Sequence, residues 1–188
     1  MEFIDRNPII YNICGKSGSG KSQIASFIEE YYREKGLRAI SLQYSYYVKE
    51  YAKKILSWDG DESKKPRDFL NEVGVELIKN KVDPYFAVRR LLEDVMVYAH
   101  FYDCITVSDT RFEEEIIKLK EKFPRTITIH IKSDFETENL TEKQKKHSTN
   151  HGLDHFTKYD FEIENNGSLE HLKEKTRKLI EEVEKYEY

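Results

Sequence analysis

Short apolar runs alternate with amphipathic stretches along this chain of 188 residues. The apolar runs have the length and the β-branched content of buried strands, and they fall at residues 9–14, 38–43, 104–108, 126–131 and 160–163. Helical periodicity occupies residues 23–30, 45–56, 67–81, 84–100, 112–122 and the stretch that begins at 168. Strands separated by helices predict right-handed crossovers and a parallel sheet. We therefore expect an α/β fold with three layers, α/β/α, around a parallel five-stranded sheet.

Two features interrupt this alternation. After the helical stretch at 45–56, two more follow before the third strand, which predicts an inserted helical region at about residues 44–100, over the edge of the sheet where ligands bind. A polar segment at about residues 133–158 has no apolar periodicity, and we expect it to act as a lid. We assign residues 1–188 to one domain that carries both features.

The motif GKSGSGKS at residues 15–22 is a complete Walker A sequence, G-x-x-x-x-G-K-[ST], between a predicted strand and a predicted helix. Its glycines let backbone N–H groups surround phosphate oxygens at the positive end of the helix. Lys21 is expected to contact the β- and γ-phosphates, and the Ser22 hydroxyl to bind Mg²⁺. The motif predicts a P-loop NTPase fold, with ATP phosphates held by Gly15, Lys16, Ser17, Gly18, Ser19, Gly20, Lys21 and Ser22.

Asp109 and Arg111 follow the predicted strand at 104–108. An acidic residue at the end of an apolar strand is the Walker B position, where it holds Mg²⁺ directly or through water. An arginine two residues later can stabilise the charge on a phosphoryl group in transfer. We expect Lys21, Asp109 and Arg111 to be catalytic and Ser22 and Asp109 to bind the metal. The alternative is that Asp109 caps the helix that begins near Phe112.

Two other motifs match known binding sites in sequence but not in their structural context. Residues 80–83, NKVD, match the guanine-binding motif of GTPases, but they continue a helical pattern and no D-x-x-G precedes them. His147, His151 and His155 are spaced by four, as zinc ligands on one helix would be, but Gly152 interrupts that helix. We therefore expect neither a GTPase nor a zinc site. A regulatory or mechanical ATPase is also disfavoured, because the residues beyond the nucleotide core form an insertion and a polar loop.

Charge and cysteine content narrow the class of protein. The net charge of −4 argues against a stable nucleic-acid partner. Cys14 and Cys104 lie inside apolar runs and are expected to be buried free thiols, which suits a reducing compartment. No signal-peptide pattern and no apolar run of membrane-spanning length occur in the sequence. We expect a cytoplasmic protein without a membrane partner.

Five segments together resemble the deoxynucleoside monophosphate kinases, within the nucleoside-monophosphate-kinase group that includes dephospho-CoA kinase. The resemblance covers nearly the whole chain. Beside the P-loop it rests on the segments YYVK at 46–49, RDFLNEVG at 67–74, DPYF at 83–86, DTRFEEE at 109–115 and IENNGSL at 163–169. The chain departs from the family pattern at Asn71, Val75 and Phe86, so the preference for an acceptor base does not carry over.

The resemblance implies ATP and Mg²⁺ as co-substrate and cofactor, and a (deoxy)nucleoside monophosphate as acceptor. It places Asn165 and Gly167 beside the adenine of ATP and Lys49 and Arg67 at the acceptor phosphate. The predicted lid has no arginine, which leaves two alternatives for the contact with phosphate. One is the set of lid lysines, Lys143, Lys145, Lys146 and Lys158. The other is a set of arginines on the acceptor side, namely Arg67, Arg89, Arg90 and Arg111. Arg89 and Arg90 are adjacent on a helix, so we expect one of them to face the cleft. One ring of the tyrosine run at 44–51, or Trp58, is a candidate to stack on the acceptor base.

Three functions stay open at this point. The first is phosphoryl transfer to a nucleoside monophosphate, and the second is transfer to another small acceptor such as dephospho-CoA. The third is a non-catalytic ATP-binding regulatory protein, which the arginine-poor lid favours. The oligomeric state is also open, with a homodimer as one option.

Overall fold

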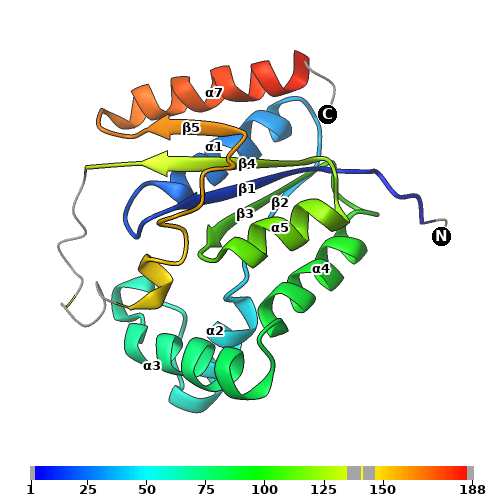
Figure 1. Ribbon diagram of the computed structural model, residues 1–188. Helices are drawn as coiled ribbons and strands as arrows, with labels where there is room; N and C mark the ends of the chain where they lie inside the picture. The colour runs from blue at the N-terminus through cyan, green and yellow to red at the C-terminus, as the bar shows by residue number, and fades with distance from the viewer. Residues whose placement is uncertain (1–2, 135–140, 142–146, 186–188) are drawn as a thin grey trace.

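The computed structural model describes residues 3–134, 141 and 147–185 (Figure 1). Its centre is a five-stranded sheet in the order β2-β3-β1-β4-β5, and each neighbouring pair is parallel. The strands are β1 (Ile9–Gly15), β2 (Ala39–Leu42), β3 (Cys104–Thr110), β4 (Thr126–Lys132) and β5 (Phe161–Glu164). The predicted parallel five-stranded sheet is confirmed.

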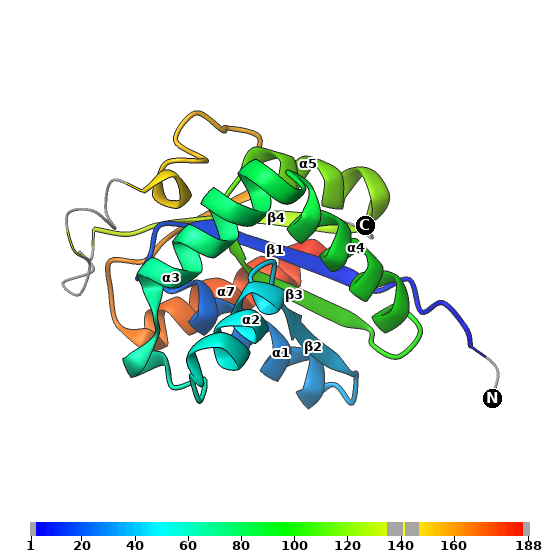
Figure 2. The ribbon, with the colours of Figure 1, turned by 90° about the horizontal axis from the view of Figure 1, so that it is seen from below.

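Helices cover both faces of the sheet, which gives the predicted three layers (Figures 1 and 2). α1 (Lys21–Glu34) and α7 (Leu169–Lys185) lie on one face, and α4 (Phe86–Tyr98) and α5 (Glu113–Lys122) lie on the other. Gly36, with φ of 75°, follows the end of α1 as the expected C-terminal cap residue, and its N–H donates to the carbonyl of Arg33. α4 begins two residues later than predicted, because Pro84 lies in the turn before it rather than in its first turn.

The alternation of side chains along β1 builds an apolar core on each face. Ile9, Tyr11 and Ile13 pack with α1 and α7, whereas Ile10 packs with α4 and α5. Cys14 and Cys104 are both buried and free, as predicted. The core therefore holds the end of β1, where the P-loop begins, between two packed layers.

The inserted region lies beyond the carboxyl ends of β2 and β3 (Figure 1). It comprises α2 (Tyr46–Leu56), the short η1 (Glu62–Lys64), α3 (Arg67–Asn71) and η2 (Glu72–Val82). The predicted helix at 67–81 is present, but its larger part, η2, is a π-helix; the N–H of Asp83, just past its end, donates to the carbonyl of Ile78, five residues back. Because Ile78 is its one buried residue, packing imposes no 3.6-residue spacing on η2.

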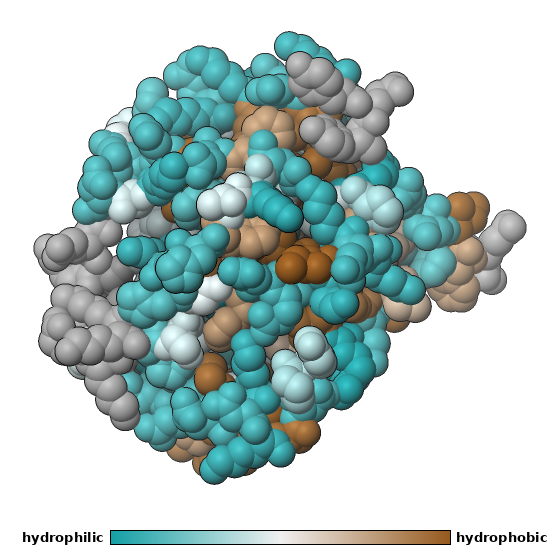
Figure 3. Space-filling view, in the orientation of Figure 1, coloured by the Kyte–Doolittle hydropathy of each residue, from teal (hydrophilic) through white to brown (hydrophobic). Residues whose placement is uncertain are grey.

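The second half of the expected lid returns to the sheet through η3 (Ser148–Asn150). Lys143, Lys145 and Lys146 lie outside the described residues, and Lys158 is exposed. The face seen in Figure 3 is mostly hydrophilic, and its hydrophobic side chains show in small separate areas. Within the described part of the chain, no helix has both the length and the apolar character that crossing a membrane requires.

Candidate active site

The P-loop at residues 15–22 joins β1 to α1 at the carboxyl edge of the sheet. Gly20, directly before α1, has φ of 101°, a conformation that other residues rarely adopt. A Cβ atom on Gly20 would lie 2.6 Å from Nδ2 of Asn165, so this position also lacks room for a side chain. The loop can thus turn tightly and point its N–H groups at phosphate oxygens.

The Lys21 side chain folds back over the loop. Its Nζ donates to the carbonyl oxygens of Gly15, at 2.8 Å, and Lys16, at 2.5 Å. Burial, with repulsion from Arg111 as the next cause, lowers the pKa of Lys21 to about 7. A phosphate group placed here would restore the charge of this lysine.

The Asp109 carboxylate, at the end of β3, accepts three hydrogen bonds from the start of the inserted region. The donors are the N–H of Tyr44 (2.9 Å), the N–H of Ser45 (3.0 Å) and the hydroxyl of Ser45 (2.6 Å). Asp109 therefore attaches the first turn of α2 to the central sheet. A carboxylate has about four lone-pair sites, so one of them is left for a metal ion or its water.

Glu115, not Asp109, caps α5. Its carboxylate accepts hydrogen bonds from the N–H of Arg111 (2.6 Å) and the N–H of Phe112 (3.0 Å). The alternative that Asp109 caps this helix is therefore wrong. Burial raises the pKa of Glu115 to about 8, although these two hydrogen bonds oppose the shift.

Arg111 meets Lys21 at a single backbone oxygen. Nη1 of Arg111 lies 3.4 Å from the Gly15 carbonyl oxygen, to which Lys21 also donates. Burial lowers the pKa of Arg111, and repulsion from Arg67 adds to the effect. Two cations from different elements thus share the position directly beside the P-loop.

Lys65 extends this basic cluster and was not among the predicted site residues. Its Nζ lies 2.9 Å from the carboxylate of Glu62, which is also 3.5 Å from Lys49. Burial lowers the pKa of Lys65, and repulsion from Lys49 and Arg67 contributes. Lys65 also contributes to the lowered pKa of Lys21. The basic run KKPR at 64–67 was the available signal, but it sits in a polar loop where lysines are usually solvated. We call Lys21, Lys49, Lys65, Arg67 and Arg111 the basic cluster.

Lys49 belongs to this cluster, whereas Arg89 and Arg90 have partners elsewhere. Nζ of Lys49 donates to Oε1 of Gln43 at 2.7 Å and lies 3.5 Å from Glu62. Arg89 pairs with Asp83 at 2.6 Å. Arg90 pairs with Glu93 at 2.8 Å and lies over the ring of Tyr47. That one of these two arginines faces the cleft stays a prediction.

Asn165 connects the loop after β5 to the P-loop. Its Nδ2 donates to the carbonyl oxygen of Ser19 at 2.9 Å, and its backbone N–H donates to Lys132. Gly167 is exposed on the same loop, before α7. Both residues thus lie on the side of the P-loop where β4 and β5 end.

The returning half of the segment expected to act as a lid packs against Arg111. A cavity of about 180 Å³ is lined by Lys16 and Arg111 on one side and by Leu153 and Phe156 on the other. A Cβ on Gly152 would contact the carbonyl of Arg111 and the ring of Phe112, so glycine permits this close approach.

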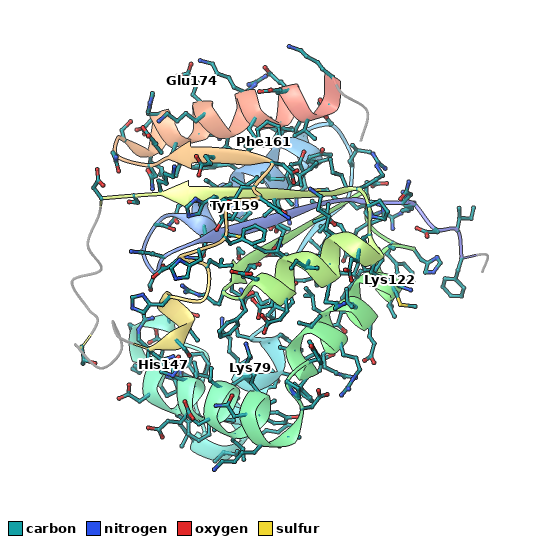
Figure 4. All side chains as sticks on the ribbon, viewed as in Figure 1. Lys79, Lys122, His147, Tyr159, Phe161 and Glu174 are labelled. Atoms are coloured by element: carbon teal, nitrogen blue, oxygen red, sulfur yellow. The ribbon has the colours of Figure 1, made fainter. Side chains whose placement is uncertain are left out.

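The three histidines of the lid do not stack on one helix. In Figure 4, His147 lies at the η3 end of the returning segment, well away from the sheet, whereas Tyr159 lies against it. His147 contacts the Thr149 hydroxyl, and turns separate it from His151 and His155. Among residues 3–134, 141 and 147–185, no three His, Cys, Asp or Glu side chains are grouped to hold a metal ion.

Comparison with known proteins identifies the family. Residues 39–176 match the deoxynucleotide monophosphate kinase family. No protein with a curated description matches the sequence.

Solved kinase structures share the fold at low identity. The APS kinase of Mycobacterium tuberculosis, solved in complex with AMPPNP and APS, is 15% identical, with a TM-score of 0.51 over 93% of this chain and 98% of that one. A sugar kinase from Janibacter sp. is 15% identical, with a TM-score of 0.55 over 93% and 95%. A gluconokinase from Sinorhizobium meliloti is 12% identical, with a TM-score of 0.51 over 97% and 99%. The chain has a P-loop fold with a basic cluster beside the P-loop. Together with this fold, the match to the family model shows that the chain belongs to the deoxynucleotide monophosphate kinase family and is a small-molecule kinase.

Proposed function

We propose that the protein transfers the γ-phosphoryl group of ATP to the phosphate of a deoxynucleoside monophosphate, which gives ADP and a deoxynucleoside diphosphate. An oxygen of the acceptor phosphate forms the new bond to the γ-phosphorus, and the bond to the β,γ-bridging oxygen breaks. That acceptor oxygen is already ionised at neutral pH, so the step needs no general base. Positioning and charge neutralisation supply the catalysis.

The shared contact of Lys21 and Arg111 carries this proposal. Lys21 comes from the P-loop and Arg111 from the end of β3, and both approach the Gly15 carbonyl oxygen. A phosphoryl group between donor and acceptor would replace that oxygen as their common partner. Arginine beside a transferring phosphoryl group stabilises the charge that its oxygens carry in the transition state.

The site also fits Mg²⁺. Ser22 is exposed at the start of α1, and Asp109 keeps one lone-pair site, so both offer the oxygen ligands that Mg²⁺ prefers. Bound there, the ion would neutralise charge on the nucleotide phosphates. Since three hydrogen bonds already occupy Asp109, we assign it a water-mediated role and Ser22 the direct one.

The remaining residues divide between donor and acceptor. We assign Asn165 and Gly167 to the adenine of ATP, which the contact of Asn165 with the Ser19 carbonyl of the P-loop supports. Lys49, Lys65 and Arg67 lie on the inserted region and are assigned to the acceptor phosphate. The segment at 133–158 would close over both and exclude water, which prevents hydrolysis of ATP.

The test is an ADP-release assay with deoxynucleoside monophosphates, ribonucleoside monophosphates and dephospho-CoA as acceptors. We expect turnover with a deoxynucleoside monophosphate. Turnover with dephospho-CoA alone would name a different kinase, and ATP binding without turnover would indicate a regulatory nucleotide-binding protein.

Lys21→Ala and Arg111→Ala should each lower kcat by about 10³-fold or more, because each removes a charge from the transition state. Arg177→Ala, an exposed arginine on α7, serves as the matched control and should retain full activity. Circular dichroism checks that all three variants are folded. Full activity of Arg111→Ala would exclude the role proposed for it.

A further inference from the structure

Three parts of the structure meet at the ring of Phe112. This residue directly follows Arg111, and its N–H donates to the Glu115 carboxylate of α5 at 3.0 Å. The ammonium group of Lys79, on η2 of the inserted region, lies over its ring (Figure 4). Gly152, in the segment that returns to the sheet, lies at the edge of the same ring. We call Lys79, Phe112 and Gly152 the Phe112 junction.

Lys79 contacts the ring and a carboxylate at the same time. Its Nζ lies 3.2 Å from the centroid of the Phe112 ring and 2.6 Å from Oε1 of Glu114. The side chain of Lys79 is 26% exposed, so water screens these contacts only in part. The electron-rich face of an aromatic ring attracts a cation, and more strongly when the cation is partly desolvated. The two contacts therefore fasten η2 to the start of α5.

Gly152 fills the space beside the ring. A Cβ atom at this position would lie 2.7 Å from Cδ1 of Phe112, and it would also contact the carbonyl oxygen of Arg111. The backbone of the returning segment thus packs directly against these two residues. The ring is confined by this segment at its edge and by Lys79 over its face.

The position of Phe112 matters because the adjoining backbone carries Arg111. The N–H groups of both residues donate to the same carboxylate oxygen of Glu115, at 2.6 Å for Arg111 and 3.0 Å for Phe112. Nη1 of Arg111 lies 3.4 Å from the Gly15 carbonyl oxygen, directly beside the P-loop. A ring that turned away would release the backbone next to Arg111 and redirect its side chain. A misplacement of about 1 Å can cost roughly 100-fold in rate.

We propose that Lys79 and Phe112 are positioning residues for phosphoryl transfer. The ammonium group of Lys79 holds the Phe112 ring in place, and the ring in turn holds the Arg111 guanidinium group at the P-loop. This inference rests on the role of Arg111 in the proposed function. Because η2 belongs to the inserted region, to which we assign the acceptor phosphate, the contact also links that region to Arg111.

A double-mutant cycle on kcat tests the contact between the two residues. Lys79→Met and Phe112→Leu should each lower kcat about tenfold and leave both KM values nearly unchanged, because Arg111 acts in the transition state. The double variant should be about as slow as either single variant, since all three lack the same contact. A loss of about 100-fold in the double variant would show that the residues act independently, which would overturn the proposal.

Two further variants separate positioning from a general loss of structure. Lys79→Arg keeps a cation over the ring and should recover most of the wild-type kcat. Lys118→Met removes a lysine that pairs with Glu121 on the surface of α5, at 2.9 Å, and should retain the wild-type kcat. Circular dichroism checks that every variant is folded. If Lys79→Arg were as slow as Lys79→Met, the cation over the ring would not position Arg111, and the proposal would be wrong.

A crystal structure of Lys79→Met gives a readout that needs no turnover. Nη1 of Arg111 should move away from the Gly15 carbonyl oxygen, which lies 3.4 Å from it when Lys79 is present. An Arg111 side chain that keeps this contact in the variant would overturn the inference, whether or not the protein transfers a phosphoryl group. A displaced Arg111 in the variant, together with a wild-type protein that phosphorylates no deoxynucleoside monophosphate, would support the inference and overturn the proposed function.

Discussion

At the scale of single residues, the P-loop lysine is the most unusual group. Lys21 is 7% exposed, and the cations around it outnumber the anions. An ordinary lysine keeps its charge well above neutral pH. Here, burial and Arg111 bring the pKa to about 7, so this residue gains or loses its proton within the physiological range.

Nucleotide affinity should therefore depend on pH through Lys21. Phosphate binding favours the charged lysine, which predominates below pH 7 and is lost above it. Between pH 6 and pH 8 the Kd for AMPPNP should rise by about tenfold relative to Lys21→Arg. Arginine does not titrate in this range, so that variant reports the pH dependence of the nucleotide itself.

Isothermal titration calorimetry in two buffers with different ionisation enthalpies would measure the protons taken up on binding. Wild type should take up close to one more proton than Lys21→Arg at pH 8. Equal uptake by both proteins would show that Lys21 is already charged in the free protein.

At the scale of elements, α5 carries a buried acid in its first turn. Glu115 joins the end of β3 to α5 through two backbone N–H groups, and burial raises its pKa to about 8. Since the folded state holds this proton more tightly than the unfolded state, the contribution of Glu115 to stability is greatest below pH 4.5. It falls as the pH rises to about 8.

Glu115→Gln should remove this loss of stability at higher pH. A single amide oxygen can accept both backbone hydrogen bonds, because both now go to the same carboxylate oxygen. The Tm of the variant relative to wild type should rise by a few degrees between pH 5 and pH 8. Glu113→Gln, on the exposed side of the same helix, should show no such change. A constant difference in Tm across this range would refute the assignment.

The strands and the P-loop could be predicted from the sequence alone, whereas the basic cluster could be predicted only in part. Each strand was predictable because five apolar runs coincide with turn signals, and the P-loop because its glycines and lysine have fixed spacing. The cluster around Arg111 was only half predictable. Arg67 and Arg111 stand in recognisable segments, but Lys65 lies in a polar loop, and only the folded chain brings it to Lys49.

Two features of the structure were not predicted from the sequence, because local sequence patterns do not determine them. The π-helical spacing of η2 has no signal in apolar periodicity, because only Ile78 is buried. The role of Asp109 in holding α2 depends on Tyr44 and Ser45, which lie more than sixty residues earlier in the chain. Long-range contacts of this kind follow from the order of the strands.

At the scale of the whole molecule, the net charge of the protein is negative, whereas the charge of the active site is positive. The chain carries −4 overall, whereas five cations form the basic cluster. A local positive field attracts anionic nucleotides to a protein that repels them elsewhere, and salt screens such a field.

Raising KCl from 50 to 500 mM should therefore weaken AMPPNP binding several-fold, despite the negative net charge. Arg67→Ala should reduce this salt dependence, because one charge of the cluster is lost. Lys173→Ala, a lysine on the surface of α7, should leave it unchanged. An affinity that rises with salt would mean that the net charge governs binding instead.

The strand order also bears on how the protein is made. Of the five strands of the sheet, β1 is synthesised first, yet Ile10 pairs with Ile105 on β3 and with Thr126 on β4. At about 5–20 residues per second, the roughly 95 residues from Ile10 to Ile105 take roughly 5 to 19 s to synthesise. During that time the apolar strand β1 has neither of its neighbours. The nascent chain therefore offers chaperones a binding segment that the finished protein buries completely.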